Sequence, residues 1–181
     1  MTSSSVSLPP LTLVAAVTRR GGLGRSGELL YRISADMKHF KSLTMGCPLI
    51  MGRKTYESFP GGPLPGRLNI VLTRGDMSLP EGAVAVHSPA EAMRVAAAYI
   101  AAREDDTPRG IMVIGGGEIY RTFMPMADTL ELTEIEADAP ADTDTWFPPV
   151  DPDAWEAVAQ GAPAIDPRSG VAYRFATYRR K

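Results

Sequence analysis

Residues 111–124 have the sequence IMVIGGGEIYRTFM, which predicts a strand, a glycine turn and a helix, an alternation also expected in the residues before it. The apolar run Ile111–Ile114 predicts a buried strand, and residues 118–124 predict a helix. Between them, Gly115-Gly116-Gly117 resembles the dinucleotide fingerprint G-x-G-x-x-G, but Tyr120 stands where its last glycine belongs. Three glycines allow a backbone to lie flat against a ligand or simply to connect two elements tightly, and the two interpretations are equally open.

Strands and helices alternate outward from this stretch. Helices are expected over Pro89–Arg103, over Arg53–Ser58, and over Ala35–Thr44 with Ser34 as its N-cap. Strands are expected at Leu11–Thr18, Pro48–Met51, Leu68–Thr73, Ala83–His87, Ile111–Ile114, Thr129–Ala137, Ala154–Gln160 and Val171–Tyr178, with a glycine-rich loop over Arg19–Arg32. This order predicts an α/β fold: a single domain with a central mixed, mostly parallel β-sheet flanked by helices and an antiparallel C-terminal edge.

Length and composition restrict the class of protein. A chain of 181 residues fits one domain, expected over residues 11–181 after a flexible, serine-rich segment at residues 1–10. The net charge of −2 provides no broad attraction for nucleic acid or membrane, and the apolar run Leu11–Val17 is too short to span a bilayer. We therefore expect a soluble cytoplasmic monomer that binds neither.

The single cysteine, Cys47, cannot form an intramolecular disulfide and is too little for a zinc cluster. We expect it to be a small buried hydrophobic residue just before a strand. No metal site is predicted.

A second strand-to-helix turn carries positive charge. Gly52 lies between strand and helix, where backbone N–H groups can approach an anion, and Arg53 and Lys54 follow it directly. The turn is not a Walker A loop, because the lysine does not follow the required glycine. Arg74 follows the strand Leu68–Thr73. If that strand lies beside the strand Pro48–Met51, Arg74 lies near Arg53. Together they favour NADP over NAD.

One carboxylate shares a helix face with an aromatic ring. Asp36 and Phe40 are four residues apart, so their side chains lie on the same side of the expected helix. Separately, each has an ordinary structural explanation, as a helix-start acid and a core residue. Together they make a cradle in which a carboxylate accepts hydrogen bonds from an aminopyrimidine and the ring packs against the heterocycle. Thr133, on an otherwise apolar strand, is a candidate hydroxyl nearby.

These residues and their order resemble dihydrofolate reductase, over roughly Leu11 to Tyr178. The resemblance rests on motifs that occur in the family's order: Val14-Ala15-Ala16, Asp36 with Phe40 and Lys41, residues 50–58 (IMGRKTYES), residues 63–70 (PLPGRLNI), residues 114–120 (IGGGEIY) and residues 144–148 (DTWFP). It implies reduction of 7,8-dihydrofolate to 5,6,7,8-tetrahydrofolate by hydride transfer from NADPH, for one-carbon metabolism, in an enzyme of the class that antifolates target.

The resemblance also implies substrate and catalytic roles. Asp36 would bind the 2-amino group and N3 of the pterin and help protonate N5, Thr133 would hydrogen-bond Asp36, and Tyr31 would be the third catalytic residue. Arg67 would pair with the α-carboxylate of the glutamate tail, a bidentate geometry that a lysine cannot copy. The implied substrate contacts are Ala16, Met37, Phe40, Phe59, Leu64, Arg67, Ile114 and Tyr120.

NADPH is the implied cofactor. Gly52–Thr55 and Gly115–Gly117 would hold its phosphates, with a cis peptide expected between Gly115 and Gly116, and Arg53 and Arg74 would meet the 2′-phosphate. The implied cofactor contacts are Ala16, Leu23, Gly24, Gly52, Arg53, Lys54, Thr55, Thr73, Arg74, Ile114, Gly115, Gly116, Gly117, Glu118, Ile119, Tyr120 and Thr145.

Two positions depart from the family pattern. Where the family usually has Leu-Pro-Trp in the loop over the active site, this chain has Leu29-Leu30-Tyr31, which restores a backbone N–H and replaces an indole with a phenol. Glu118 stands where some relatives have an arginine against the adenine. The alternatives to this activity are a pyrimidine reductase of riboflavin synthesis, which shares the fold but does not need Asp36 with Arg67, and a non-catalytic nucleotide-binding module.

Overall fold

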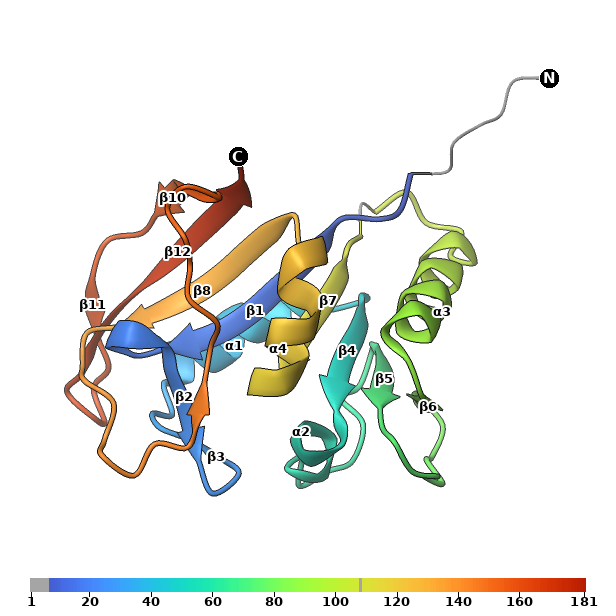
Figure 1. The fold of residues 1–181 in the computed structure, drawn as a ribbon, viewed down its shortest axis with the longest axis horizontal. Helices are drawn as coiled ribbons and strands as arrows, with labels where there is room; N and C mark the ends of the chain where they lie inside the picture. The colour runs from blue at the N-terminus through green and yellow to red at the C-terminus, as the bar shows by residue number, and fades with distance from the viewer. Residues whose placement is uncertain (1–6, 108) are drawn as a thin grey trace.

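A computed structural model describes residues 7–107 and 109–181, and these form a nine-stranded sheet with helices on both faces (Figure 1). The strand order is β10-β12-β8-β1-β7-β4-β5-β6, and β11 pairs with β12. The strands of this sheet are β1 (Leu11–Val17), β4 (Pro48–Gly52), β5 (Leu68–Leu72), β6 (Ala83–Val86), β7 (Ile111–Gly115), β8 (Thr129–Ile135), β10 (Trp155–Gln160), β11 (Ala164–Ile165) and β12 (Ala172–Arg180).

Neighbouring strands from β8 to β6 in this order are parallel, whereas β12 runs antiparallel to β8 and to β10. The expected fold class is therefore confirmed, including the antiparallel C-terminal edge. Because the parallel strands all end at one edge, the turns that follow β1, β4, β5 and β7 gather there. In open α/β sheets this is the edge at which ligands bind.

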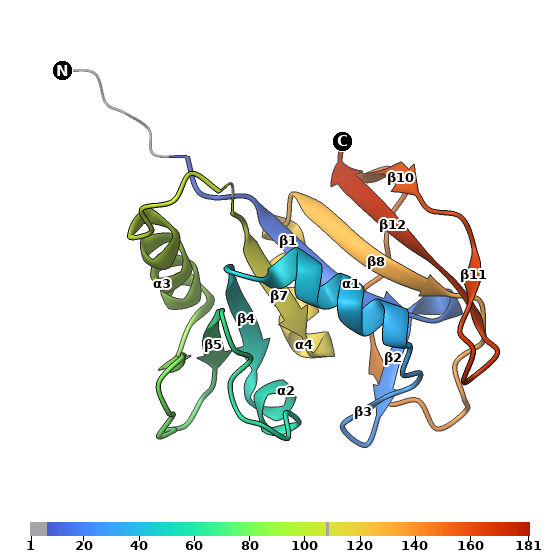
Figure 2. The ribbon, with the colours of Figure 1, turned by 180° about the vertical axis from the view of Figure 1, so that it is seen from behind.

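Helices cover the two faces unequally. α1 (Ser34–Thr44) lies across one face, as Figure 2 shows, while α3 (Pro89–Ala101) and α4 (Gly117–Phe123) pack on the other. The main core lies on the α3 and α4 side, where Ala92, Ala96 and Phe123 are fully buried. α2 (Arg53–Glu57) and two short 3₁₀ helices, η1 (Arg19–Gly21) and η2 (Met124–Met126), complete the helices.

A second, three-stranded sheet lies where a plain loop was predicted. Within Arg19–Arg32, β2 (Gly22–Arg25) pairs with β3 (Glu28–Leu29) and, on its other side, with β9 (Thr145–Trp146). The prediction of a loop was wrong because glycines in β2 give no strand signal and its partner β9 is only two residues long and far away in sequence. This small sheet joins residues 22–29 to the segment after β8.

The start of α1 also differs from the prediction. Ser34 is the first helical residue rather than the N-cap, and Ile33 occupies the cap position without a side-chain hydrogen bond. Ile33 is 2% exposed and packs with Ile135 and Tyr173. Apolar packing just before the helix therefore sets its start, in place of a capping hydroxyl.

Several boundaries shift by a few residues. The helix expected from Glu118 begins at Gly117, and β11, which precedes the hairpin to β12, had no counterpart in the prediction. Residues 1–6 of the expected flexible segment lie outside the described residues. At position 10 the chain is already attached to the sheet, because the Pro10 carbonyl accepts a hydrogen bond from the Ile111 N–H.

The N-terminus of α3 offers a test of local stability. The Ser88 side chain accepts a hydrogen bond from the Glu91 N–H at 3.1 Å, and the Glu91 carboxylate accepts one from the His87 N–H at 2.8 Å. Ser88→Ala should lower the free energy of unfolding by about 1 kcal/mol, since it leaves a helix-end N–H unpaired. Urea unfolding measures the change; Ser78→Ala, at an exposed position outside the helices, is the control, and equal stabilities for the two variants would contradict the prediction.

Candidate active site

β1 and β7 pair only at their beginnings. Leu11–Leu13 are in register with Ile111–Val113, whereas β1 stays paired with β8 as far as Val17. The two strands therefore part toward their carboxyl ends. Separation of neighbouring strands at this edge is the feature that admits a ligand into an open parallel sheet.

Tyr120 of α4 packs at the point of separation. Its hydroxyl donates a 2.6 Å hydrogen bond to the Val14 carbonyl, and its ring lies beside Gly115, where a Cβ atom would come within 3.2 Å of the hydroxyl. Burial, and next the charge of Asp36, raise the pKa of the Tyr120 hydroxyl. The hydroxyl is therefore a permanent donor, and Tyr120 lies within the electrostatic reach of Asp36.

The two glycine turns meet side by side. A Cβ atom at Gly52 would lie 3.1 Å from Ile119, and one at Gly116 would lie 3.7 Å from the Thr55 hydroxyl. The peptide between Gly115 and Gly116 is cis, as expected. The strand–turn–helix units β4–α2 and β7–α4 thus form one continuous, glycine-rich surface, although the sequence pointed only to each turn separately.

β9 adds a third segment to this surface. A Cβ atom at Gly117 would lie 3.0 Å from the Trp146 carbonyl and 3.1 Å from Thr145, so only glycine allows this approach. Asp144 anchors the active-site loop beside it: its carboxylate accepts a 2.8 Å hydrogen bond from the Ser26 N–H, and its own N–H donates to the Gly24 carbonyl. The Ser26 bond, followed by that from Thr145, lowers the pKa of Asp144.

The loop itself carries the departure from the family pattern. The Leu30 N–H donates a hydrogen bond to the Leu23 carbonyl at 3.3 Å, and a proline at position 30 would have no such donor. The side chain of Leu23 is buried in the main core. The N–H that Leu30 has in place of proline thus closes the β2–β3 hairpin on itself.

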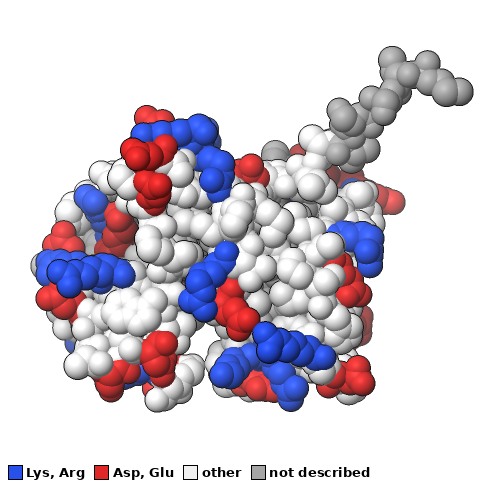
Figure 3. Space-filling view, in the orientation of Figure 1, with Lys and Arg blue, Asp and Glu red and all other residues white. Residues whose placement is uncertain are grey.

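Basic side chains gather beside the glycine surface. β4 and β5 are neighbours, with Gly52 in register with Leu72, which brings Arg53 within 3.9 Å of a Cβ position at Gly75. Arg53 pairs with Glu57 at 2.7 Å, and Arg74 pairs with Glu118 at 3.4 Å. Both pairs are exposed, so they contribute little to stability and can exchange for a phosphate. Figure 3 shows Lys and Arg gathered over α2, with acidic groups between them.

Asp36 forms the polar centre of the opposite face. The Thr133 hydroxyl of β8 donates a 2.5 Å hydrogen bond to the Asp36 carboxylate on α1, although the two residues are far apart in sequence. Burial raises the pKa of Asp36, and the Thr133 hydrogen bond and the nearby His39 oppose that rise. A carboxyl group with a raised pKa, held by one hydroxyl, takes up a proton more readily than an exposed carboxyl group does.

Small and aromatic residues surround this pair. Ala16 is in register with Thr133, and Phe175 is in register with Thr133 on the other side. Tyr31 and Ala16 pack against the same small cluster, built on Ile33, Ile135 and Tyr173. His39, one turn beyond Asp36, stacks on Phe175 with ring centroids 4.0 Å apart. The sequence analysis did not identify His39, because no motif connects it with β12.

A cavity of 320 Å³ continues from α1 toward Arg67, lined by Met37, Lys38, Phe40, Lys41, Leu64 and Arg67. Arg67 is 7% exposed as a residue, and its guanidinium donates from Nε to the Pro65 carbonyl at 3.0 Å and from one terminal nitrogen to the Thr44 hydroxyl at 3.1 Å. Burial lowers its pKa. Three of its five N–H donors remain for an anion.

Phe59, Leu64 and Ile114 pack against the cluster formed by Leu49, Met51 and Val71, on the same sheet face. The expected substrate contacts therefore divide between the Asp36 centre, the Arg67 cavity and this cluster. Thr44 and Lys38 were missed, since only the folded chain brings them beside Arg67.

Within residues 7–107 and 109–181, no group of three His, Cys, Asp or Glu side chains is arranged to hold a metal ion. None of the helices in that part of the chain is long and apolar enough to cross a membrane. Cys47 is buried, as expected.

Comparison with known sequences gives a consistent result. The family model described as dihydrofolate reductase matches residues 10–180. Dihydrofolate reductase HdrB of Haloferax volcanii is 43% identical over 172 residues, covering 93% of this chain and 82% of that relative. The dihydrofolate reductase of Neisseria gonorrhoeae is 36% identical over 168 residues, covering 93% of this chain and 96% of the relative.

Comparison with solved structures finds the same family. Dihydrofolate reductase from Enterococcus faecalis, complexed with NADP(H) and RAB-propyl, superimposes with a TM-score of 0.78 at 32% sequence identity. The match covers 95% of this chain and 96% of that one.

Proposed function

Because the chain belongs to the dihydrofolate reductase family, and so reduces 7,8-dihydrofolate to 5,6,7,8-tetrahydrofolate with NADPH, we propose that Asp36 is the residue that binds the pterin. The observation that carries this assignment is the 2.5 Å hydrogen bond from Thr133, which fixes a partly buried carboxylate at the edge of the sheet. The Asp36 oxygens accept from the 2-amino group and N3 of the pterin, and Thr133 sets their orientation.

Protonation of N5 follows from the same geometry. N5 lies beyond the edge of the pterin that Asp36 grips, so the proton reaches it from solvent through water, with the carboxyl group stabilising the protonated ring. Tyr31, at the position of the family's tryptophan, packs at this end of the site, and its hydroxyl orients that water. Phe40, Met37, Phe59 and Leu64 enclose the rings and exclude bulk water.

Arg67 receives the glutamate tail of the substrate. Its fork of unused N–H groups faces a cavity whose other walls are mainly apolar, as a benzoyl group requires. Lys38 and Lys41 at the same cavity add positive charge near the carboxylates.

The glycine-rich surface of the two turns fits the cofactor's phosphates. A Cβ atom at Gly52 would crowd Ile119, so glycine there lets the two turns lie close together, and the N–H groups at the starts of α2 and α4 can meet an anion. When bound, NADPH supplies the hydride that passes from C4 of its nicotinamide to C6 of the dihydropterin. Ala16 and Leu23 hold the carboxamide through their backbones, and Ile114 and Tyr120 line the region where the two rings meet. The remaining contacts are Gly24, Gly52, Arg53, Lys54, Thr55, Thr73, Arg74, Gly115, Gly116, Gly117, Glu118, Ile119 and Thr145.

Selectivity for NADPH over NADH should depend on Arg53 and Arg74, which exchange their carboxylate partners for the 2′-phosphate. Replacing both by methionine should reduce the ratio of kcat/KM for NADPH to that for NADH by about 10-fold to 100-fold, because two charge-assisted contacts are lost. Steady-state kinetics with each cofactor measures the ratio. Arg94→Met, which removes an exposed arginine of α3 that is not among the expected cofactor contacts, is the control. An unchanged ratio would assign the 2′-phosphate to other residues.

Loss of absorbance near 340 nm, the approximate absorption of reduced nicotinamide, on mixing the chain with NADPH and dihydrofolate tests the activity directly. A pyrimidine reductase would act instead on an aminopyrimidine ribosyl phosphate, and a non-catalytic module on neither. The Asp36–Thr133 pair and the Arg67 cavity favour the folate substrate over both.

The remaining proposals concern the oligomeric state, the cell compartment, the partners and the domain organisation. We propose a monomer that works in the cytoplasm without nucleic acid or membrane, with residues 11–181 as its one domain. The net charge of −2 and the alternation of acidic and basic groups in Figure 3 support this setting. Sedimentation at micromolar concentration, with and without DNA, checks the monomeric state and the absence of nucleic-acid binding.

A further inference from the structure

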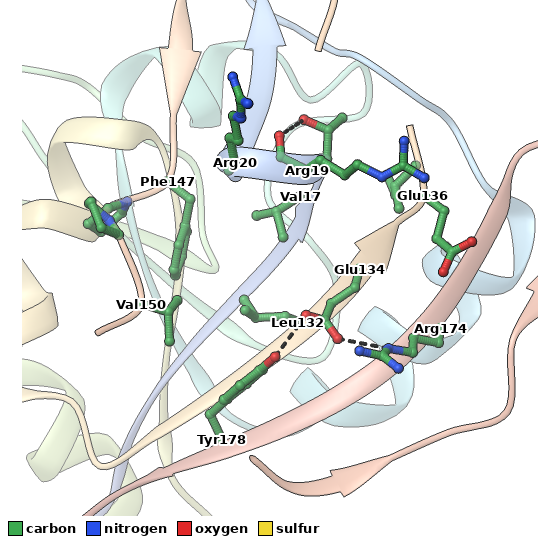
Figure 4. A pocket seen from close by; sticks show the side chains of 15 residues that line it. Val17, Arg19, Arg20, Leu132, Glu134, Glu136, Phe147, Val150, Arg174 and Tyr178 are labelled. Carbon is green, nitrogen blue, oxygen red and sulfur yellow. Dashed lines mark hydrogen bonds and ion pairs between the residues drawn. The ribbon is translucent and has the colours of Figure 1, made fainter. Parts of the chain in front are cut away.

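A larger cavity, of 580 Å³, lies on the face of β8 that points away from Asp36 (Figure 4). Side chains alternate along a strand, so Leu132 and Glu134 face this cavity while Thr133 between them faces the active site. The cavity is bounded by the end of β1, by η1, and by the segment after β9. Its described lining includes none of the residues assigned above to pterin or cofactor.

The walls are apolar and partly aromatic. Val17 and Leu132 form the floor, and Phe147, Pro148 and Val150 form one side. Phe147 is itself held in place by Tyr120, with ring centroids 4.9 Å apart. Rigid proline and aromatic surfaces of this kind suit a flat ring better than a flexible chain.

The polar groups of the cavity differ in how many hydrogen bonds the chain itself provides for them. Both Glu134 oxygens already accept hydrogen bonds, one from Arg174 Nε at 3.0 Å and the other from the Tyr178 hydroxyl at 2.8 Å. Burial, and then the bond to Glu134, raise the pKa of Tyr178 to about 12, so its hydroxyl remains a donor. Among the described residues, the terminal nitrogens of Arg174 have no hydrogen-bond partner. Glu136 is a second acid in the lining, but Arg19, Arg20 and Arg174 outnumber the two acids, so the cavity carries net positive charge.

We propose that this cavity is a second, non-catalytic binding site for a flat aromatic carboxylic acid. The ring packs against Val17, Leu132 and Phe147, and the carboxylate accepts from Arg174. An anion is favoured over a cation because three arginines and two glutamates line the cavity, and Glu134 has both oxygens engaged within the chain.

Occupancy of this site is coupled to the active-site loop through the backbone. The Phe147 N–H donates to the Gly21 carbonyl at 2.7 Å, and both residues line the cavity. Gly22, the next residue, begins β2 and pairs with Trp146 of β9. A ligand that positions Gly21 and Phe147 therefore biases the small sheet that carries Asp144 and the Ser26 bond, and the effect on cofactor affinity must be reciprocal.

The binding test uses 1-naphthoate as the probe and the full chain saturated with NADP⁺ and folate, so that the active site is blocked. Titration followed by ¹H–¹⁵N spectra should shift the amides of Gly21, Phe147 and Val150 saturably. Arg174→Met should weaken 1-naphthoate by about tenfold or more and leave the neutral analogue 1-naphthamide unaffected. Arg179→Met, on the same strand but exposed and outside the cavity, is the matched control. Val150→Trp, which fills the cavity, should abolish binding of both probes.

Three results would overturn the proposal: no saturable shift at millimolar 1-naphthoate, shifts that disappear once the active site is blocked, or equal weakening by Arg174→Met and Arg179→Met. The coupling is tested separately from the reductase activity itself, by measuring the dissociation constant of NADP⁺ with and without saturating 1-naphthoate. An identical constant in both conditions would disprove the coupling.

Discussion

Asp36→Asn is expected to lower kcat/KM for dihydrofolate by about 10²-fold to 10⁴-fold at neutral pH, the range for removal of a group that assists proton transfer. The amide keeps the size of the carboxyl and can still meet Thr133, but it cannot carry the negative charge that stabilises a protonated pterin. The dissociation constant of NADPH should stay nearly unchanged, because the cofactor surface is built from the β4–α2 and β7–α4 turns. Steady-state kinetics and fluorescence titration measure the two quantities, with exposed Asp106→Asn as the control. Unaltered turnover would remove Asp36 from the mechanism.

The same variant should not be less stable at neutral pH. Burial raises the pKa of the Asp36 carboxyl in the folded chain, so its ionised form costs folding free energy above that pKa. Below the unfolded-state pKa the group is protonated in both states, and the cost is absent. Asp36→Asn should therefore match or exceed the wild-type Tm at about pH 7, and any gain should vanish toward about pH 3. A lower Tm at neutral pH would mean that the Thr133 hydrogen bond outweighs the burial of charge.

Arg67→Lys is expected to raise KM for dihydrofolate on the order of a hundredfold, with a much smaller change in kcat. A lysine keeps the positive charge, but it cannot donate two parallel hydrogen bonds while also reaching Pro65 and Thr44. The glutamate tail is remote from the reacting ring, so the loss should appear mainly in binding.

A truncated substrate provides the control for this variant. With 7,8-dihydrobiopterin, a dihydropterin that has no benzoylglutamate tail, wild type and Arg67→Lys should have the same kcat/KM. If the variant is impaired equally with both substrates, Arg67 acts through the fold of the loop at residues 59–66 rather than through the tail.

The part of this molecule that the sequence predicted is the part governed by local patterns. Apolar runs such as Leu11–Val17 and glycine turns such as Gly115–Gly117 can be recognised from a few consecutive residues. Their order along the chain was therefore enough to predict the parallel sheet. The pairing of Asp36 with Thr133 came from the family resemblance, because nothing local connects α1 with β8. The hydrogen bond between them agrees with it.

What the sequence did not predict depends on contacts between distant segments. β2 becomes a strand because it pairs with Glu28–Leu29 on one side and with Thr145–Trp146 on the other, whereas its glycines by themselves indicate a loop. Ile33 replaces Ser34 at the cap because Ile135 and Tyr173 bury it. The 580 Å³ cavity needs the segment after β9 to cross β8, and no residue of Phe147–Val150 signals that path on its own.

The hydrogen bond from Leu30 to Leu23 has a consequence for inhibitor design. Proline at position 30 would have no N–H, so in a Leu30→Pro variant the Leu23 carbonyl would be left to accept from the donor group of a ligand. In this chain the same donor would have to compete with a bond that the protein already makes. A compound whose donor group is aimed at the Leu23 carbonyl should therefore bind Leu30→Pro more tightly than it binds this chain.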